Sequence, residues 1–375
     1  MKVQVLQENL QRGLSIVGRA VATRSTLPIT ANVLLMTDKG QLKLAATDLD
    51  ISISTRVGAK IDEEGATTVP SRLLGDFVSS LPPATVLLEI PERSRQVKLE
   101  CARNESTIHT MDAEDFPRIH SFSDGTTLTL DAKALRKTIE RVEFAAAADD
   151  SRPVLTGVHV KAVGKKLTFA SADGFRLAVS DIMLDTAPAE PVEVIVPARA
   201  LREVARLVGD GSEPVEMRLN PQRTQVLFAI NETELVAQLI QGTFPNYNQL
   251  IPTDCNTKCT FDVDEFKREA RIAAIFARDG SGIIRLQMAP GDGGPGKLTV
   301  SARADEIGDN QGEIDAKVEG DASRIAFNSR YLQDVLNALS GEVKLEMTSP
   351  SSQGVFRPVG DDAYVHVVMP MFVQW

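Results

Sequence analysis

The same series of sequence features occurs three times along the chain. The run LKLAATD begins at Leu42, and similar runs begin at Leu167 and Leu298, at separations of about 125 and 131 residues. Three further features recur in the same order at steps of about 125–131 residues: a strand that leads into a helix at Pro70, Pro197 and Asn328, an apolar helix position at Leu10, Leu135 and Phe266, and a closing proline at Pro117, Pro245 and Pro370. Because chance does not align four independent features, the sequence predicts three tandem copies of one domain.

The predicted domains span residues 1–122, 128–252 and 256–375. A period of about 125–131 residues is too long for a solenoid repeat and fits a self-contained domain. Turn-forming residues cluster at the two joins, in HSFSDGTT (120–127) and PTDCNTK (252–258). Within each copy the order is helix, strands, helix, strands, which predicts an α+β domain with two helices beside antiparallel sheets.

Hydrophobic periodicity supports both kinds of element. After Pro197, the apolar residues Leu201, Val204 and Val208 recur with the i, i+3, i+7 spacing of one helix face. Pro197 itself is suited to the first turn of that helix. The alternation in Ile51–Ile53 indicates a strand with one buried face.

The charged residues are unevenly distributed. The chain has a formal net charge of −10 and is 43% hydrophobic and 25% charged, which is ordinary for a globular protein and argues against one that coats nucleic acid with its whole surface. The six predicted helices sum to about +4 and the rest of the chain to about −14. Two interpretations stay open: these are ordinary solvated surface helices, or they share one face that meets a polyanion.

Cysteine content and hydropathy predict the compartment. The chain has 3 cysteines, too few for a disulfide scaffold, which favours a reducing environment. No stretch approaches the roughly 18 apolar residues of a membrane span. The N-terminal MKVQVLQENLQRG has no apolar core of signal-peptide length. We expect a soluble, cytoplasmic protein that does not bind membranes.

No group of residues has the spacing of a catalytic, metal or cofactor site. The segment GDGGPGK (291–297) resembles a phosphate-binding loop, but Leu298 stands where a hydroxyl is needed, so we expect a hairpin turn. Cys255 and Cys259 have no histidine close by in the sequence, so we expect unliganded thiols. The sequence therefore predicts a protein that is not an enzyme and uses no metal or cofactor.

Asp48, Asp173 and Asp305 lie at equivalent points of the three copies. An enzyme could use such repeated acids, but these would fall in three separate domains rather than in one cleft. A role in turns after a strand is the favoured interpretation for Asp48 and Asp173.

The C-terminal segment VVMPMFVQW has one polar side chain in nine residues, although chain ends are usually polar. A final core strand accounts for Val365 and Val367. It does not account for Met371, Phe372 and Trp375 beyond the proline, and exposed methionine and aromatic side chains form adaptable binding surfaces. The segment therefore indicates a site for a peptide or protein partner.

The residues that carry the repeat also match a known family. The matching stretches are TLPITANVLL (26–35), ATDLDISIS (46–54), GATTVPSRLL (65–74), DAEDFPRI (112–119), ADGFRLAV (172–179), GTFPNYNQLIP (242–252), FNSRYLQDVLNAL (327–339) and YVHVVMPMF (364–372). Together and in order, they resemble the β sliding clamp family, the processivity subunit of bacterial DNA polymerase III. The resemblance covers the whole chain, and the family's three-domain build agrees with the repeat.

The resemblance implies three copies of the DNA-clamp fold and a head-to-tail homodimer that closes into a ring around duplex DNA without sequence preference. Such a clamp tethers the replicative polymerase, the clamp loader and repair proteins through short peptide motifs and confers processivity. The residues expected to face DNA are Arg12, Arg19, Arg24, Arg72, Lys133, Arg136, Lys137, Arg141, Arg199, Arg202 and Arg206. The alternative that stays open is a protein-binding scaffold that does not encircle DNA.

The resemblance also implies two protein contact sites. The dimer contact would join the first domain near Ile108 to the third domain near Ile275 and Phe276. The partner-peptide pocket, between the second and third domains, would consist of Leu155, Gly174, Phe175, Arg176, Leu177, Pro245, Leu250, Asn328, Tyr331, Val367, Val368, Met369, Pro370 and Met371.

The chain departs from the family pattern at four places. Many members have a basic residue at the position of Gln249, an aromatic residue is frequent at Ser106, and some relatives have histidine at Phe175. Most members also end in Arg-Leu where this chain continues as Phe372–Trp375. We expect the changes at Gln249 and in the tail to alter which peptide the pocket prefers, and Phe175 to keep the base of the site apolar. The change at Ser106 concerns the dimer contact.

Overall fold

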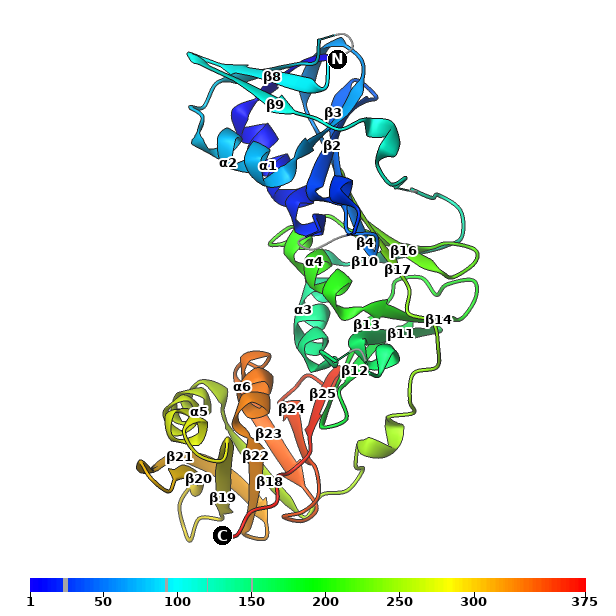
Figure 1. Ribbon diagram of the computed structural model, residues 1–375. Helices are drawn as coiled ribbons and strands as arrows, with labels where there is room; N and C mark the ends of the chain where they lie inside the picture. The colour runs from blue at the N-terminus through cyan, green and yellow to red at the C-terminus, as the bar shows by residue number, and fades with distance from the viewer. Residues whose placement is uncertain (23–25, 92–93, 120, 150) are drawn as a thin grey trace. The chain divides into compact units, whose positions relative to one another are not determined.

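The computed structural model describes residues 1–22, 26–91, 94–119, 121–149 and 151–375 (Figure 1). Arg24, which was expected to face DNA, lies outside these residues. The chain forms two units, Met1–Lys133 with Glu203–Leu239 and Ala134–Arg202 with Ile240–Trp375. Within the described part, no helix is long and apolar enough to cross a membrane.

The first unit contains two antiparallel sheets and the helices α1 (Gln7–Val17) and α2 (Ser71–Ser80), which pack against each other (Figure 1). The first sheet has the order β5 (Ala59–Glu63), β1 (Lys2–Leu6), β7 (Thr85–Glu89), β8 (Gln96–Cys101), β9 (Asn104–His109). The second has the order β10 (Thr126–Leu130), β15 (Val215–Leu219), β16 (Gln225–Ile230), β17 (Thr233–Gln238), β4 (Ile51–Val57), β3 (Gln41–Thr47), β2 (Asn32–Asp38), β6 (Ala66–Pro70). Strands from two sequence repeats thus join in one sheet through the β17–β4 pair.

Helix α1 shows how the repeat's apolar anchors build the core. Leu10, Leu14 and Val17 are buried at i, i+4, i+7 spacing on the face that contacts β3 and β4. Gly13 lies on the same face, where an added Cβ would come 3.0 Å from Val57 and 3.1 Å from the Leu44 side chain. Glycine at this position therefore lets the helix approach the sheet closely.

The second unit contains one 12-stranded antiparallel sheet and the adjacent helices α5 (Val263–Arg278) and α6 (Ser329–Asn337) (Figure 1). Its order is β14 (Val192–Pro197), β11 (Gly157–Val163), β12 (Lys166–Ala172), β13 (Arg176–Met183), β25 (Tyr364–Val368), β24 (Gly354–Pro358), β23 (Glu342–Met347), β18 (Thr257–Asp262), β21 (Gly308–Gly320), β20 (Gly296–Ala304), β19 (Ile283–Ala289), β22 (Ser323–Asn328). Helices α3 (Ala132–Val142) and α4 (Ala198–Val208) each contain a boundary between the two units.

Side-chain caps set the starts of α5 and α6. The Asp262 carboxylate accepts hydrogen bonds from the backbone N–H groups of Asp264 and Glu265, and Asn328 caps α6 in the same way. Within α5, Phe266 and Ala270 are buried at i, i+4 spacing. The caps and the apolar face together explain why the helices begin where the repeat predicted.

Most sequence expectations for the elements are confirmed. The alternating residues lie in strands. Residues 291–295 of GDGGPGK (291–297) lie in the connection between β19 and β20, its last two residues begin β20, and the two strands pair as a hairpin. Pro197 was assigned to the first turn of a helix; it is instead the last residue of β14, and α4 begins at Ala198. Cys255 and Cys259 are free thiols, and burial raises the pKa of Cys259 to about 12. The exact domain boundaries stay a prediction.

Candidate partner-binding groove

The residues expected to form the partner pocket all lie in the second unit, where β13 and β25 bring distant parts of the chain together. In the antiparallel pair, Arg176 lies opposite Val368 and Leu177 opposite Val367. Beyond the strand, the N–H of Met369 donates to the carbonyl of Phe175 over 2.8 Å. The sheet register therefore places the turn before β13 beside the C-terminal segment.

The turn before β13 is fixed by Asp173. Its Oδ1 accepts hydrogen bonds from the N–H groups of Phe175 (2.9 Å) and Arg176 (3.0 Å). Gly174 has φ +94, a conformation that other residues rarely adopt, and an added Cβ would lie 2.9 Å from Nη1 of Arg152. The turn leaves the Phe175 side chain 57% exposed among the residues expected to form the partner pocket, which we call the candidate groove. The predicted turn role of Asp173 is confirmed.

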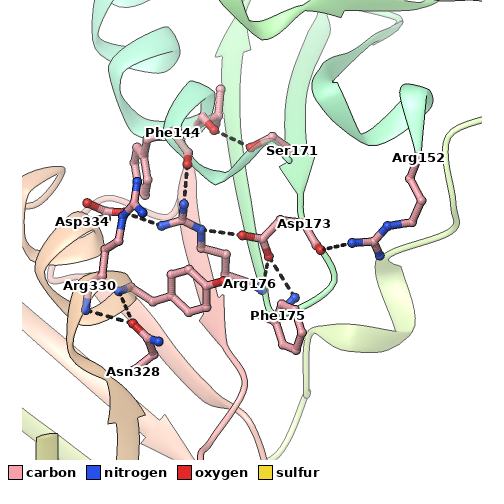
Figure 2. A network of polar contacts seen from close by, with 11 residues as sticks. Phe144, Arg152, Ser171, Asp173, Phe175, Arg176, Asn328, Arg330 and Asp334 are labelled. Atoms are coloured by element: carbon pink, nitrogen blue, oxygen red, sulfur yellow. Dashed lines mark hydrogen bonds and ion pairs between the residues drawn. The ribbon is translucent and has the colours of Figure 1, made fainter. Parts of the chain in front are cut away.

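Arg176 links the turn before β13 to α6 and to the Phe144 carbonyl (Figure 2). Its Nε donates to Asp173 over 3.0 Å, its Nη1 pairs with Asp334 of α6 over 2.6 Å, and its Nη2 donates to the carbonyl of Phe144 over 2.6 Å. The guanidinium also lies over the rings of Tyr331 and Phe144, 4.5 and 5.4 Å from the centroids. Because this buried charge has two carboxylate partners and an acceptor carbonyl, its orientation is fixed.

Tyr331 and Phe175 form an aromatic pair at one end of the groove. Their ring centroids lie 6.3 Å apart with the planes 25° from parallel. The Asn328 side chain accepts from the N–H of Tyr331 over 3.3 Å at the start of α6, which fixes the backbone that carries the Tyr331 ring. Burial raises the pKa of Tyr331, and the negative charge of Asp173 acts in the same direction. The hydroxyl therefore stays protonated near neutral pH.

The floor of the groove is apolar. Leu177 and Val367 belong to a buried cluster against which Tyr247 packs. Leu155 belongs to a neighbouring cluster that Tyr247 also contacts. Leu250, three residues after Tyr247, is 45% exposed. Buried valine and leucine beneath exposed apolar side chains form a surface suited to apolar peptide residues.

The C-terminal tail contacts strands β19 and β22 of the third repeat. Phe372 is 88% exposed, and Met371 and Trp375 are about 40% exposed, as expected from the sequence, whereas Val365 and Val367 are buried strand residues. Three contacts hold the tail: the Met371 N–H donates to the Ala326 carbonyl (2.7 Å), Arg285 donates to the Gln374 carbonyl (3.3 Å), and the Arg324 guanidinium lies 4.9 Å from the Trp375 ring centroid.

The side chains expected to face DNA lie mainly on α1, α2, α3 and α4, and most are exposed. Arg72 is almost fully exposed, and Arg12, Lys133 and Arg199 are also exposed. Ion pairs within the protein link Arg19 to Glu203 (3.4 Å), Arg136 to Glu140 (2.8 Å), Lys137 to Asp361 (3.3 Å), Arg202 to Glu143 (2.7 Å) and Arg206 to Glu203 (2.7 Å). These pairs reduce the positive charge that the helices offer to a polyanion.

Arg141 requires a correction. It was expected to face DNA, but only 8% of its surface is exposed. Its Nη1 pairs with Asp361 over 2.9 Å, and its guanidinium lies 4.8 Å from the Tyr364 ring centroid. Because Arg141 is occupied inside the protein, we remove it from the DNA-facing set.

The residues expected at the dimer contact differ in exposure. Ile275 on α5 is 58% exposed and Phe276 is half-buried, so both are accessible. Ile108 is only 4% exposed, so its side chain packs inside its own domain rather than at a surface. Its strand β9 is nevertheless an edge strand of the first sheet, so the strand offers its main-chain edge instead.

Two residues of the groove were missed from the sequence. Asp334 follows Tyr331 by three residues on α6, so helical spacing could have placed it on the same face. Tyr247 lies in the matched stretch 242–252, but no periodicity marks it as a wall between two clusters. Within the described ranges, no three His, Cys, Asp or Glu side chains are grouped to hold a metal ion.

The fold is that of DNA polymerase sliding clamps. A sliding clamp structure from Bacillus subtilis matches it with a TM-score of 0.93 at 25% identity over 100% of both chains. A Pseudomonas aeruginosa sliding clamp bound to griselimycin matches with a TM-score of 0.90 at 28% identity, also over 100% of both chains.

The sequence comparisons define the family. The models of the DNA polymerase III beta subunit match residues 1–120 (N-terminal domain), 129–246 (central domain) and 248–372 (C-terminal domain). The beta sliding clamp of Synechococcus elongatus is 32% identical over 99% of both chains. That of Pseudomonas putida is 31% identical over 99% of this chain and 100% of its own. The chain therefore belongs to the DNA polymerase III beta subunit family, and the expected fold of three tandem clamp domains is confirmed.

Proposed function

We propose that the chain is a sliding clamp that encircles duplex DNA as a head-to-tail homodimer and tethers the replicative polymerase and other DNA-processing proteins to it. The observation that carries this function is the match of three successive clamp domains along the chain, together with the 0.93 TM-score against a clamp over 100% of both chains. A protein that acts by tethering needs no catalytic group, in keeping with the prediction that the chain is not an enzyme.

The helix number is compatible with a ring of useful size. The six α-helices of the described residues give twelve in a dimer. Twelve helices at spacings of about 9–10 Å have a circumference near 110–120 Å. The centre-line diameter is then about 36 Å, and subtracting a helix width of about 10 Å leaves a hole of about 26 Å. A B-form duplex about 20 Å wide would pass with a layer of water.

Retention by such a ring rests on topology rather than on affinity. Tight phosphate contacts would slow movement along DNA, so a modestly basic lining is sufficient for a clamp. The ion pairs of Arg202 with Glu143 and of Arg206 with Glu203 support a lining of this kind. A head-to-tail contact forms a closed ring instead of a fibre when the rotation that relates neighbouring subunits adds up to a full turn.

We propose that the groove binds short extended peptides of partner proteins. The apolar floor around Leu177 and Val367 would receive apolar side chains, and the Phe175–Tyr331 pair would form the aromatic end. The Pseudomonas aeruginosa clamp that matches this chain was solved bound to griselimycin, which supports a ligand site on this fold. The cytoplasmic location stays a prediction.

Enclosure is tested by release from DNA ends. The clamp is labelled with a fluorophore, loaded on a nicked circular plasmid with a clamp loader, and followed by gel filtration before and after one restriction cut. We expect retention on the circle, loss after the cut, and retention on cut DNA whose ends are blocked by biotin–streptavidin. Equal retention on circular and open linear DNA would contradict enclosure, and no DNA association at all would favour the scaffold alternative.

A further inference from the structure

Within the described residues, two strand pairs join successive repeats, and both have the same register. Between the first and second repeats, β4 pairs with β17 and Thr55 lies opposite Thr233. Between the second and third repeats, β13 pairs with β25 and Ser180 lies opposite Tyr364. In both cases the fifth residue of one strand lies opposite the first residue of the other. We call these two pairs the internal joints.

The third repeat and the first repeat each contain an equivalent of one of these strands. The leucines that begin the repeated run, Leu42, Leu167 and Leu298, lie opposite the seventh residue of β4, β13 and β21, which in β21 is Ile314. The other partner ends a row of four strands in each repeat, β1–β7–β8–β9, β10–β15–β16–β17 and β18–β23–β24–β25. Strand β21 is therefore the equivalent of β4 and β13, and β9 is the equivalent of β17 and β25.

Both of these equivalent strands have an open edge. Strand β9 is the last strand of its sheet. Strand β21 pairs with β20 along Gly308–Ala316, whereas its other edge pairs, among the described residues, only at Lys317–Gly320. An open edge offers unpaired N–H and C=O groups to another chain. In the head-to-tail contact of the proposed function, β9 of one copy would cover β21 of the next.

The charges on the two strands favour the register of the internal joints for this contact. That register places Glu105 opposite Gln311, so the carboxylate faces a neutral side chain. A shift by two residues would place Glu105 opposite Asp309 in one direction and opposite Glu313 in the other, and like charges directly opposite each other destabilise a strand pair. A shift by one residue would exchange the two faces of β9, of which one carries the buried Ile108.

The same register places Ser106 opposite Asn310. In the first internal joint the equivalent residues are Leu235 and Ile53, and both are 0% exposed. His366, the equivalent of Ser106 in the second internal joint, is also fully buried. Within a single copy, Ser106 and Asn310 are both partly exposed. A second copy would therefore bury the two side chains against each other.

Asn310 lacks a hydrogen-bond partner for its carbonyl within one copy. Its Oδ1 is buried, and no donor among the described residues reaches it. Directly opposite residues have Cβ atoms about 4.5–5.5 Å apart, which a serine hydroxyl and an asparagine amide can span. The hydroxyl can donate to the amide oxygen or accept from the amide nitrogen. The first internal joint contains a polar pair of this kind, since the buried hydroxyls of Thr55 and Thr233 lie 2.8 Å apart.

We propose that Ser106 of one copy and Asn310 of the next form a buried polar pair, and that this pair makes the joint between copies selective. The pair is favourable only when both members are present, because a buried amide opposite an apolar side chain loses its hydrogen bond without compensation. The inference rests on the homodimer of the proposed function and adds to it the register and the side chains that the two copies must match.

Cross-linking of the full-length chain tests the register. Thr107→Cys and Asp309→Cys, which the register places directly opposite each other, are made in separate chains that also carry Cys255→Ser to remove the exposed native thiol. A mixture of the two should form a disulfide on mild oxidation. Neither variant should cross-link alone, because a head-to-tail contact does not bring a residue beside its own equivalent. Thr107→Cys mixed with Gln311→Cys, a diagonal pair, is the matched control and should cross-link about fivefold less.

A double-mutant cycle tests the polar pair. The dimer Kd is measured by sedimentation of fluorescently labelled chains over a dilution series. Ser106→Leu and Asn310→Leu should each weaken the dimer about tenfold, because each leaves a buried polar group without its partner. The double variant should return to within about threefold of the unchanged chain, since two apolar residues satisfy the position as they do in the first internal joint. Thr107→Leu, an exposed neighbour on the other face of β9, should change Kd less than about twofold.

The outcomes separate the polar pair from the homodimer itself. A stable dimer in which Thr107→Cys cross-links to Gln311→Cys rather than to Asp309→Cys would overturn the register and leave the proposed function intact. Losses of affinity that add in the double leucine variant would show that Ser106 and Asn310 act independently and would overturn the pair. A chain that stays monomeric at micromolar concentration would overturn the homodimer as well as this inference.

Discussion

The turn Asp48–Ile51 of the first repeat and the turn Asp173–Arg176 of the second have the same construction and different roles. In each, the aspartate Oδ1 accepts the N–H groups two and three residues ahead, at 3.2 and 2.9 Å for Asp48 and at 2.9 and 3.0 Å for Asp173. Each turn also contains a residue with positive φ, Leu49 at 84° and Gly174 at 94°. The turn itself is therefore common scaffold.

The difference lies in the residue that ends each turn. Ile51 is 2% exposed and contributes to the apolar core of its domain. Arg176, at the equivalent position, is 8% exposed and reaches Asp334 on the next repeat. At this position of the repeat, isoleucine in the first copy packs in the core, whereas arginine in the second copy forms a polar link to the third. The candidate groove lies beside that link.

The largest expected effect comes from breaking the polar link. Arg176→Met should destabilise the second unit by about 3 kcal/mol, because it leaves Asp173 and Asp334, which are 13% and 31% exposed, without their cation. Chemical denaturation followed by fluorescence of the single tryptophan, Trp375, measures this unit.

The matched change in the first repeat is Ile51→Met, which conserves volume and polarity. It should cost less than about 1.5 kcal/mol, measured by circular dichroism because Trp375 lies in the other unit. Comparable losses of stability from the two substitutions would show that Arg176 contributes only by packing. They would remove the distinction between the turns.

A smaller effect is expected from acid. His366 in β25 is fully buried and stacks on Phe144, and burial lowers its pKa to about 3, with the charge of Arg176 acting in the same direction. The unfolded chain, with an ordinary histidine pKa near 6.5, binds a proton first, so stability falls as the pH drops below about 6.5. At pH 5 the loss from this residue is about 2 kcal/mol.

Denaturation midpoints at pH 7 and pH 5 measure that loss. His366→Phe should reduce the difference between the two pH values, whereas His109→Gln, an exposed histidine in the first unit, should keep it. A pH response that is unchanged in His366→Phe would assign the acid sensitivity to other groups.

The smallest expected effects come from exchanging the positive-φ residues. Gly174→Ala should destabilise by about 1 kcal/mol through backbone strain, since the nearby Arg152 guanidinium is the end of a flexible side chain and can move. Leu49→Gly should relieve similar strain and change stability by less than about 1 kcal/mol. Thermal denaturation of each variant measures the size and direction of its stability change, and a stabilising Gly174→Ala would refute the strain argument.

The fold was largely predictable from the sequence because periodicity encodes it. The anchors Leu10, Leu135 and Phe266 are all fully buried, and the helix that the apolar spacing predicted after Pro197 is α4 (Ala198–Val208). The boundary error at Pro197 is local, since proline suits both a strand end and the start of a helix.

The site was less predictable because charge pairing depends on contacts between distant residues. Arg141 and Arg199 were both predicted to face DNA, because each is a basic residue of a predicted helix. Arg141 is instead buried against Asp361, which lies more than two hundred residues away in the chain. The same limit hid the part played by Asp334, because nothing in a single sequence pairs it with Arg176. The exposure of Phe372 and Trp375 was predictable, since it followed from composition at a chain end.

The tail that follows Pro370 also has a consequence for self-association. Strand β22 is an outermost strand of the 12-stranded sheet, and the Ala326 carbonyl on it is bonded by the Met371 N–H. An open strand edge recruits other chains and promotes aggregation. The tail therefore also covers part of the open edge of β22. A chain shortened before Met371 would expose this strand edge to pairing with other chains, in addition to losing the exposed apolar residues of the tail.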